Sequence, residues 1–253
     1  MSAARSTATP PSPLAPEETV FAPVRSQTAF EETVDRLATA IKLGLLAPGT
    51  RLPAERELCI RLGIARSTLR QALSALAQGG FLYATRGRGG GTFVADPGPP
   101  VEPPSPEILA NWREVADARL ALEVGIVVLA AERASAEALA TLGSLVDQMH
   151  EQLEDFPAYR QSDVLFHVGL AEATGNPRLI ALSTAIQGEM TGLISYISHP
   201  SEVLNSANHQ HRRLVSALRV HDGPLAAAVM TEQAQATEHI LAGLLPDLPP
   251  PGG

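Results

Sequence analysis

The sequence predicts a mainly α-helical protein with an N-terminal winged helix-turn-helix and a C-terminal antiparallel bundle of helices. Two short helical patterns separated by Gly63 precede a Gly-rich hairpin, which indicates the first part. A Pro-rich segment then interrupts the chain, and only amphipathic helical patterns follow it. The chain has 253 residues, enough for two small domains that each bury a core.

Segments of biased composition divide the chain. Residues 1–27 are rich in Ser, Ala and Pro and lack hydrophobic periodicity, so we expect a disordered tail there. Residues 96–106 contain two Pro-rich runs, which predict a semi-rigid linker. We therefore expect a first domain over residues 28–95, a second domain over residues 107–245 and a disordered tail over residues 246–253.

Charge is distributed unequally between the two parts. The net charge is −8, yet residues 25–94 carry 10 basic and 5 acidic side chains, whereas the remainder carries 9 and 22. A basic module in an acidic protein favours an anionic partner for that module alone. The single cysteine, Cys59, excludes an intramolecular disulfide, and no stretch approaches the roughly 18 apolar residues of a membrane span. We expect a soluble cytoplasmic protein with no membrane partner.

The first domain is expected to contain three helices and a hairpin. Helical patterns cover Phe30–Leu43, Ala54–Leu62 and Ala65–Ala77, and each ends at or near a glycine. The β-prone runs Phe81–Tyr83 and Thr92–Val94 flank a basic Gly-rich tip, which predicts a hairpin. Two short helices joined by a tight turn are typical of a helix-turn-helix.

The second helix of this motif has two distinct faces. Four apolar residues share one arc and predict its core side: Leu69, Ala72, Leu73 and Leu76. Arg66, Ser67, Arg70 and Gln71 fall on the opposite arc, where a guanidinium can donate two hydrogen bonds to guanine in a major groove. An ordinary solvated face is the alternative, but the turn, the basic hairpin and the local positive charge together favour DNA.

Three stretches of the first domain resemble the winged helix-turn-helix of GntR-type regulators. They are GLLAPGTRLPAEREL at residues 44–58, GIARSTLRQAL at residues 63–73 and GGGTFV at residues 89–94. Because they match three elements in order, the resemblance is specific. The sequence departs from the family at Ala54 and Ala65, where members often carry a Ser that would cap the following helix.

The resemblance implies a set of DNA contacts: Arg56, Arg66, Ser67, Thr68, Arg70, Arg88 and Gly89. Arg56, Arg66 and Arg70 would make the main base and phosphate contacts, with the two hydroxyl residues assisting. The Arg88–Gly89 tip of the hairpin would lie at the minor groove. The implied partner is a short, near-palindromic DNA operator bound by a homodimer.

Helical patterns fill the second domain: Asn111–Arg133, Ser135–Leu153, Ala158–Ala173, Pro177–Ser195, Ser201–His221 and Pro224–Leu244. Asp163 and His167 are four residues apart and share a helix face, so they can bind one metal ion. His211 and Gln233 lie 11 residues before and after Asp222, where the chain turns sharply. If these two helices are antiparallel, His211 and Gln233 come level, although a helical His is more often a surface or core residue than a ligand.

Four further stretches resemble the FCD effector domain of the FadR subgroup: RLALE at 119–123, DVLFH at 163–167, GNPRL at 175–179 and HRRLV at 211–215. In metal-bearing members the site is Asp plus three His, so the resemblance implies Asp163, His167 and His211 as ligands to zinc, nickel or manganese. The third His would fall at Gln233, whose neutral amide is a poor ligand. Arg119 matches a pocket-facing position that can pair with a carboxylate effector, and a salt bridge to Glu123 is its alternative.

These observations lead to one main hypothesis. The chain is expected to be a homodimeric DNA-binding regulator, acting as a repressor, that responds to a small organic acid held by Arg119, by a divalent metal or by uncharged imidazoles. One alternative is a metal-dependent enzyme that uses the Asp and His residues. The other is an architectural DNA-binding protein without an effector.

Overall fold

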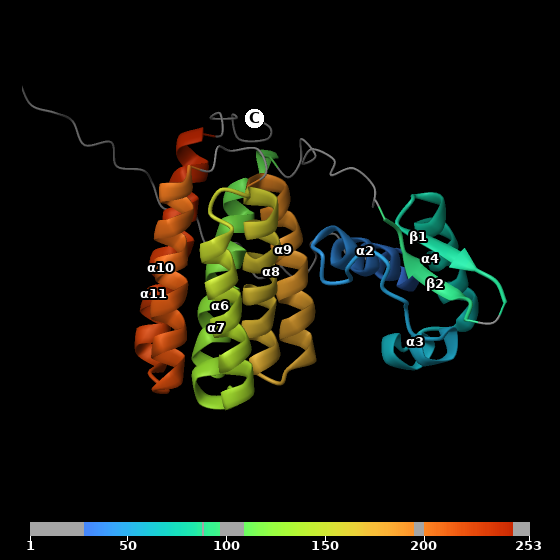
Figure 1. Ribbon diagram of the computed structural model, residues 1–253, viewed down its shortest axis with the longest axis horizontal. Coiled ribbons are helices and arrows are strands. Elements are labelled where there is room, and N and C mark those ends of the chain that lie inside the picture. Colours follow the sequence, from blue (N-terminus) through green and yellow to red (C-terminus); the bar gives the residue numbers. More distant parts are fainter. Residues whose placement is uncertain (1–27, 88, 97–108, 195–199, 245–253) are drawn as a thin grey trace, which may run out of the picture.

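The computed structural model describes residues 28–87, 89–96, 109–194 and 200–244. Several sequence predictions lie outside the described residues: the two tails at 1–27 and 246–253, the linker from residue 97 onward, and Arg88. The described chain forms a small N-terminal domain and a helical bundle (Figure 1).

The N-terminal domain contains α2 (Ala29–Lys42), α3 (Glu55–Leu62), α4 (Arg66–Gln78), β1 (Leu82–Thr85) and β2 (Gly91–Val94). Its core includes Leu37 of α2, Leu58 of α3 and Leu82 of β1. The predicted apolar face of α4 is buried, with exposed fractions of 0–8% for Leu69, Ala72, Leu73 and Leu76. Because this face packs into the core, the opposite face of α4 is exposed to solvent.

The turn between α3 and α4 is the tight one that the sequence predicts. Gly63 follows α3 with φ of 67°, in the left-handed region that glycine adopts at low cost. Neither Ala54 nor Ala65 makes a side-chain hydrogen bond at the helix start that it precedes. By contrast, Thr28 and Glu31 form a reciprocal capping box at the start of α2.

The wing is an antiparallel hairpin of β1 and β2, in which Leu82 pairs with Val94 and Tyr83 with Phe93. The first strand begins at Leu82, one residue later than the sequence predicted, because Phe81 still belongs to the turn that follows α4. At the tip, a Cβ on Gly90 would lie only 2.5 Å from the Thr85 carbonyl oxygen. The glycine therefore lets the two strands close.

The second domain is a bundle of six described helices: α6 (Trp112–Arg133), α7 (Ala136–Glu151), α8 (Phe156–Ala173), α9 (Pro177–Ile194), α10 (Ser201–Arg219) and α11 (Gly223–Leu244). They run roughly parallel and antiparallel to one another (Figure 1). α11 packs closely on α6 and α10, and α8 packs on α7 and α9. None of the described helices is both long enough and apolar enough to cross a membrane.

The N-terminal domain meets the bundle through α2, which lies against α9 (Figure 1). A Cβ on Gly188 of α9 would come within 2.8 Å of the Thr39 methyl group of α2, so the two helices approach closely there. Leu43, just after α2, is buried with Val164 and Val168 of α8. The same two bundle helices also supply side chains to the site described next.

Candidate functional site

The exposed face of α4 carries the basic and hydroxyl side chains that the sequence indicated. Arg66, Ser67 and Arg70 are exposed, Thr68 is partly buried, and Arg56 is exposed on α3. Since α4 follows α3 after a short turn, these side chains belong to one compact motif. This is the arrangement with which a recognition helix offers several donors to a DNA groove.

An acidic residue that sequence reasoning missed lies between the two arginines of α4. One carboxylate oxygen of Glu55, Oε2, is 3.1 Å from the Nε of Arg66 and 3.1 Å from the Nε of Arg70. The hydrogen bond from Arg66 makes the largest contribution to lowering the pKa of Glu55. Glu55 thus holds the two guanidinium groups beside each other on the exposed face.

The wing presents a glycine-rich tip. Gly89 is exposed with φ of 90°, a conformation that other residues rarely adopt, and Arg86, directly after β1, is exposed. Arg51 donates a hydrogen bond of 2.6 Å to the Gly90 carbonyl and so supports the tip. The predicted contact residue Arg88 is outside the described part of the chain.

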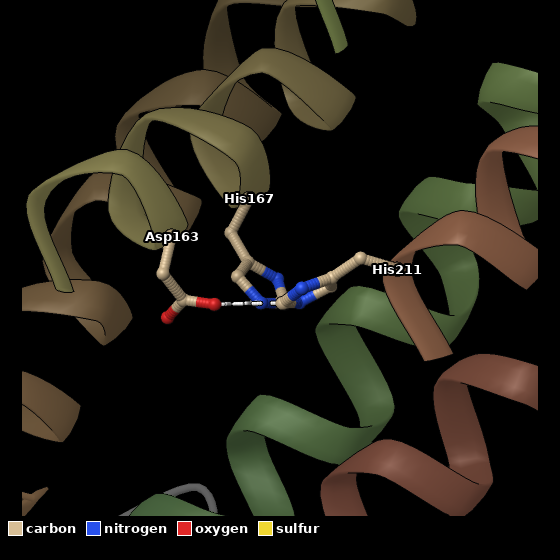
Figure 2. A group of neighbouring side chains, drawn as sticks. All are labelled: Asp163, His167 and His211. Carbon is tan, nitrogen blue, oxygen red and sulfur yellow. Dashed lines mark ion pairs between the residues drawn. The ribbon is translucent and has the colours of Figure 1, made fainter. Parts of the chain in front are cut away.

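In the bundle, Asp163, His167 and His211 come together (Figure 2). Asp163 and His167 project from α8 and His211 from α10, and one ligand atom from each lies within 4.8 Å of the others. The Asp163 Oδ1 atom is 3.3 Å from His211 Nε2 and 3.7 Å from His167 Nε2. All three side chains are buried. One oxygen and two imidazole nitrogens are a donor set that suits zinc and similar divalent ions.

Gln233 of α11 also reaches this site. Its amide nitrogen contacts His211 Nε2, so the α10–α11 hairpin brings positions 211 and 233 level as their spacing predicted. Gln233 is buried, with 4% of its surface exposed. Its Oε1 atom and the Nδ1 atom of His211 have no hydrogen-bond partner among the described residues. Buried polar atoms without a partner are rare in protein interiors, and the free Gln233 Oε1 acceptor is compatible with an additional ligand.

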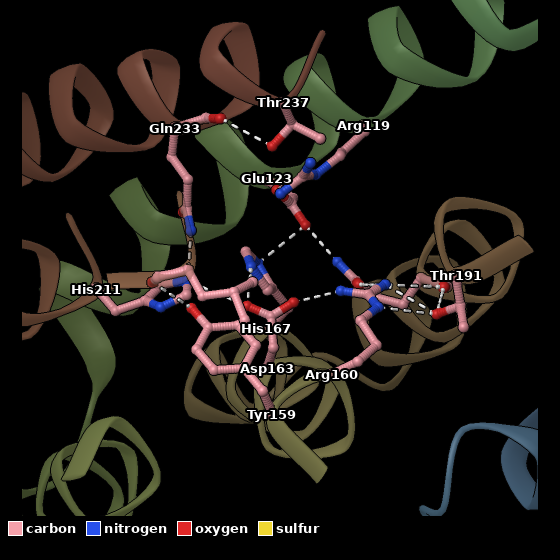
Figure 3. A network of polar contacts seen from close by, with 12 residues as sticks. Arg119, Glu123, Tyr159, Arg160, Asp163, His167, Thr191, His211, Gln233 and Thr237 are labelled. Carbon is pink, nitrogen blue, oxygen red and sulfur yellow. Dashed lines mark hydrogen bonds and ion pairs between the residues drawn. The ribbon is translucent and has the colours of Figure 1, made fainter. Parts of the chain in front are cut away.

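A second buried carboxylate, Glu123 of α6, lies beside Arg119 and His167 (Figure 3). It pairs with Arg119 at 3.0 Å, accepts a 2.6 Å hydrogen bond from Gln187 and lies 3.0 Å from His167 Nδ1. A carboxylate at Nδ1 favours the tautomer that leaves the Nε2 lone pair free for a ligand. Arg119 thus makes the salt bridge to Glu123 that the sequence analysis gave as an alternative to a role in the pocket. It also borders the cavity described below.

Arg160 is the main component of the site that the sequence analysis missed. It lies three residues before Asp163 and pairs with the Asp163 Oδ2 atom. Its other donors reach α9: Nε and Nη2 bind the Thr191 hydroxyl at 3.1 and 2.9 Å, and Nη2 binds Gln187 Oε1 at 2.8 Å (Figure 3). Arg160 is 7% exposed, so its charge is removed from water along with that of Asp163.

The surroundings set the charge of each group. Burial on its own would raise the pKa of Glu123, but Arg119 and then His167 outweigh burial and lower that pKa to about 2. Burial would likewise raise the pKa of Asp163, and Arg160 makes the largest opposing contribution, so that pKa is lowered. Burial lowers the pKa of His211 to about 3, which keeps the imidazole uncharged. Both carboxylates are therefore ionised, and His211 is a neutral donor.

A cavity of about 320 Å³ opens beside these charged groups. Its polar wall includes Arg119, Arg160, Asp163 and Gln233. Its lining also includes the apolar residues Phe156, Ile194, Val203, Leu204, Ala207 and Ile240. A cavity lined by apolar side chains together with a few polar groups is typical of a site for a small molecule.

The described chain thus combines a winged helix-turn-helix with a helical bundle that contains a charged cavity. Residues 30–94 match the family described as "Bacterial regulatory proteins, gntR family", and residues 114–236 match the FCD domain. The chain belongs to the GntR family and carries an FCD domain. This membership confirms the resemblance inferred from the sequence and places the chain among transcription regulators rather than enzymes.

Individual relatives agree with the family. The chain is 37% identical over 168 residues to the "Putative HTH-type transcriptional regulator RmpR" of Mycobacterium gastri, which covers 62% of this chain and 58% of that relative. It is 27% identical over 213 residues to the "HTH-type transcriptional repressor NanR" of Salmonella newport, covering 79% and 80%. The solved structure of Escherichia coli McbR/YncC is 21% identical and has a TM-score of 0.54, covering 86% and 99%, which supports the fold.

Proposed function

We propose that this chain is a ligand-responsive, sequence-specific DNA-binding regulator that acts as a repressor. The observation that carries this proposal is the exposed arginine pair of α4, Arg66 and Arg70, on a helix-turn-helix joined to a bundle with a charged cavity. The family and a relative named as a repressor support the same assignment.

The first test is selection of DNA by the purified full chain from a pool of random duplexes, followed by binding measurements over a range of salt concentrations. Because the positive charge is concentrated in the N-terminal domain, affinity should fall steeply as salt displaces phosphate contacts. Enrichment of no common sequence, or a flat salt dependence, would contradict sequence-specific binding.

We also propose that the chain acts as a homodimer. A single winged domain buries little DNA surface, and twofold symmetry doubles that surface and explains a near-palindromic operator. Light scattering of the full chain should give twice the mass of one chain. A monomer at micromolar concentration that still binds the selected duplex with full affinity would contradict this proposal.

For the bundle we propose a divalent metal site made by Asp163, His167 and His211, with Gln233 at the fourth position. The buried donors, the neutral imidazole of His211 and the Glu123 carboxylate at His167 Nδ1 all support it. A bound ion would attract the carboxylate of a small organic acid, and Arg119 at the cavity wall would attract the same group.

The position of Gln233 gives this metal proposal a direct test. Gln233→His would supply a third imidazole, so zinc should bind more tightly than to the wild type and raise the melting temperature further. His211→Ala in the same background should abolish both effects. Calorimetry and thermal melting in zinc measure them, and an unchanged affinity in Gln233→His would contradict the metal site.

A further inference from the structure

We propose that the buried guanidinium of Arg160 supplies the positive charge beside Asp163 that a metal ion would otherwise supply. Arg160 therefore competes with a metal for that site. The inference rests on the proposed metal site and concerns a residue outside the donor set. Arg160 pairs with Oδ2 of Asp163, whereas Oδ1 of the same carboxylate faces the two histidines. One carboxylate therefore serves both the guanidinium and the candidate metal position.

Charge balance is the first argument. Two arginines, Arg119 and Arg160, and two carboxylates, Glu123 and Asp163, are buried together as two ion pairs. These four charges cancel without any metal. A divalent ion would add two positive charges, and among the described residues no further buried acid compensates them. Like charges a few ångströms apart repel strongly in a protein interior.

The packing behind Arg160 is the second argument. Thr191 and Gln187 of α9 accept hydrogen bonds from its Nε and Nη2 atoms, so the guanidinium is held beside Asp163. On the other side of the site, the Gln233 amide nitrogen contacts His211 Nε2, the atom that would bind a metal. A metal at Oδ1 would therefore share the Asp163 carboxylate with Arg160, and it would have to displace the Gln233 amide from His211 Nε2.

The test is a zinc titration by calorimetry, with a melting curve in zinc for each protein. Arg160→Gln removes the charge but keeps an amide for Thr191, and its zinc affinity should rise about tenfold or more because the repulsion is gone. Arg160→Lys keeps the charge and should bind zinc about as the wild type does. Equal or weaker zinc binding by folded Arg160→Gln would overturn the proposal, since the guanidinium would then support the ligand instead of competing with the metal.

A second pair of variants leaves Arg160 in place, in case its replacement prevents folding. Thr191 is only partly buried, so Thr191→Asp can place a carboxylate beside the guanidinium and weaken its repulsion of a bound ion. Zinc affinity should rise by about threefold or more, whereas the neutral Thr191→Asn should stay close to the wild type. No difference between these two variants would also overturn the proposal.

Gln233→His separates this inference from the metal proposal itself. If Gln233→His binds zinc tightly while Arg160→Gln and Thr191→Asp match the wild type, the metal site stands and the competing role of Arg160 is wrong. If none of the variants binds zinc, the metal site and the role of Arg160 are both wrong. If all three bind zinc more tightly than the wild type, both are supported.

Discussion

The exposed arginines of α4 and the buried arginines of the bundle all form ion pairs with carboxylates, but the first pair lies in solvent and the second in the protein interior. The side chains of Arg66 and Arg70 are 69% and 63% exposed, and both pair with one carboxylate, Glu55. In the bundle, the side chains of Arg119 and Arg160 are 6% and 8% exposed, and each has a carboxylate of its own. Burial, and not the number of ion pairs, distinguishes the two regions.

This difference determines what each group can do. An ion pair on the surface contributes about 0–1 kcal/mol, so the α4 arginines can leave Glu55 for a DNA base or phosphate at little cost. Breaking a buried pair leaves a charge without a partner and costs about 3–5 kcal/mol. The buried arginines therefore hold the geometry and charge of the cavity, and a ligand must match that charge.

The largest expected effect comes from breaking a buried pair. Arg119→Ala should lower the free energy of unfolding by about 3–5 kcal/mol, because the buried Glu123 carboxyl then lacks its main partner. Urea unfolding measures this change. In the double variant Arg119→Leu with Glu123→Leu no charge is stranded, so most of the stability should return. A loss below about 1 kcal/mol in Arg119→Ala would show that the buried pair behaves like a surface pair.

Replacing the shared carboxylate on the surface should have a much smaller effect. Glu55→Gln should change the free energy of unfolding by less than about 1 kcal/mol, since the pair is exposed. Non-specific DNA binding should tighten because a negative charge is removed, while preference for the selected operator should fall severalfold because the arginines are less well positioned. Fluorescence anisotropy on selected and unrelated duplexes measures both. A gain in operator preference would contradict a positioning role for Glu55.

Periodic and short-range features were predictable from the sequence. The faces of α4 follow from helical periodicity, and the pair of Asp163 and His167 follows from a spacing of four residues. The meeting of His211 and Gln233 followed from equal distances to the turn at Asp222, because an antiparallel helix pair fixes which positions come level.

Contacts that depend on packing between helices were not predictable. Glu55 reaches Arg66 and Arg70 because α3 packs against α4. Arg160 is on the same helix as Asp163, and their spacing of three residues permitted a pair. Nothing in one sequence showed that Thr191 and Gln187 of α9 would enclose Arg160, or that the pair would be buried.

The most direct test of the division between surface and buried arginines is operator affinity in Arg66→Ala, measured together with its stability. Affinity for the selected duplex should fall by about 1–3 kcal/mol, with relaxed specificity at the base that Arg66 reads, while the melting temperature stays close to that of the wild type. Equal operator affinity in Arg66→Ala and wild type would contradict the assignment of α4 as the DNA-reading helix.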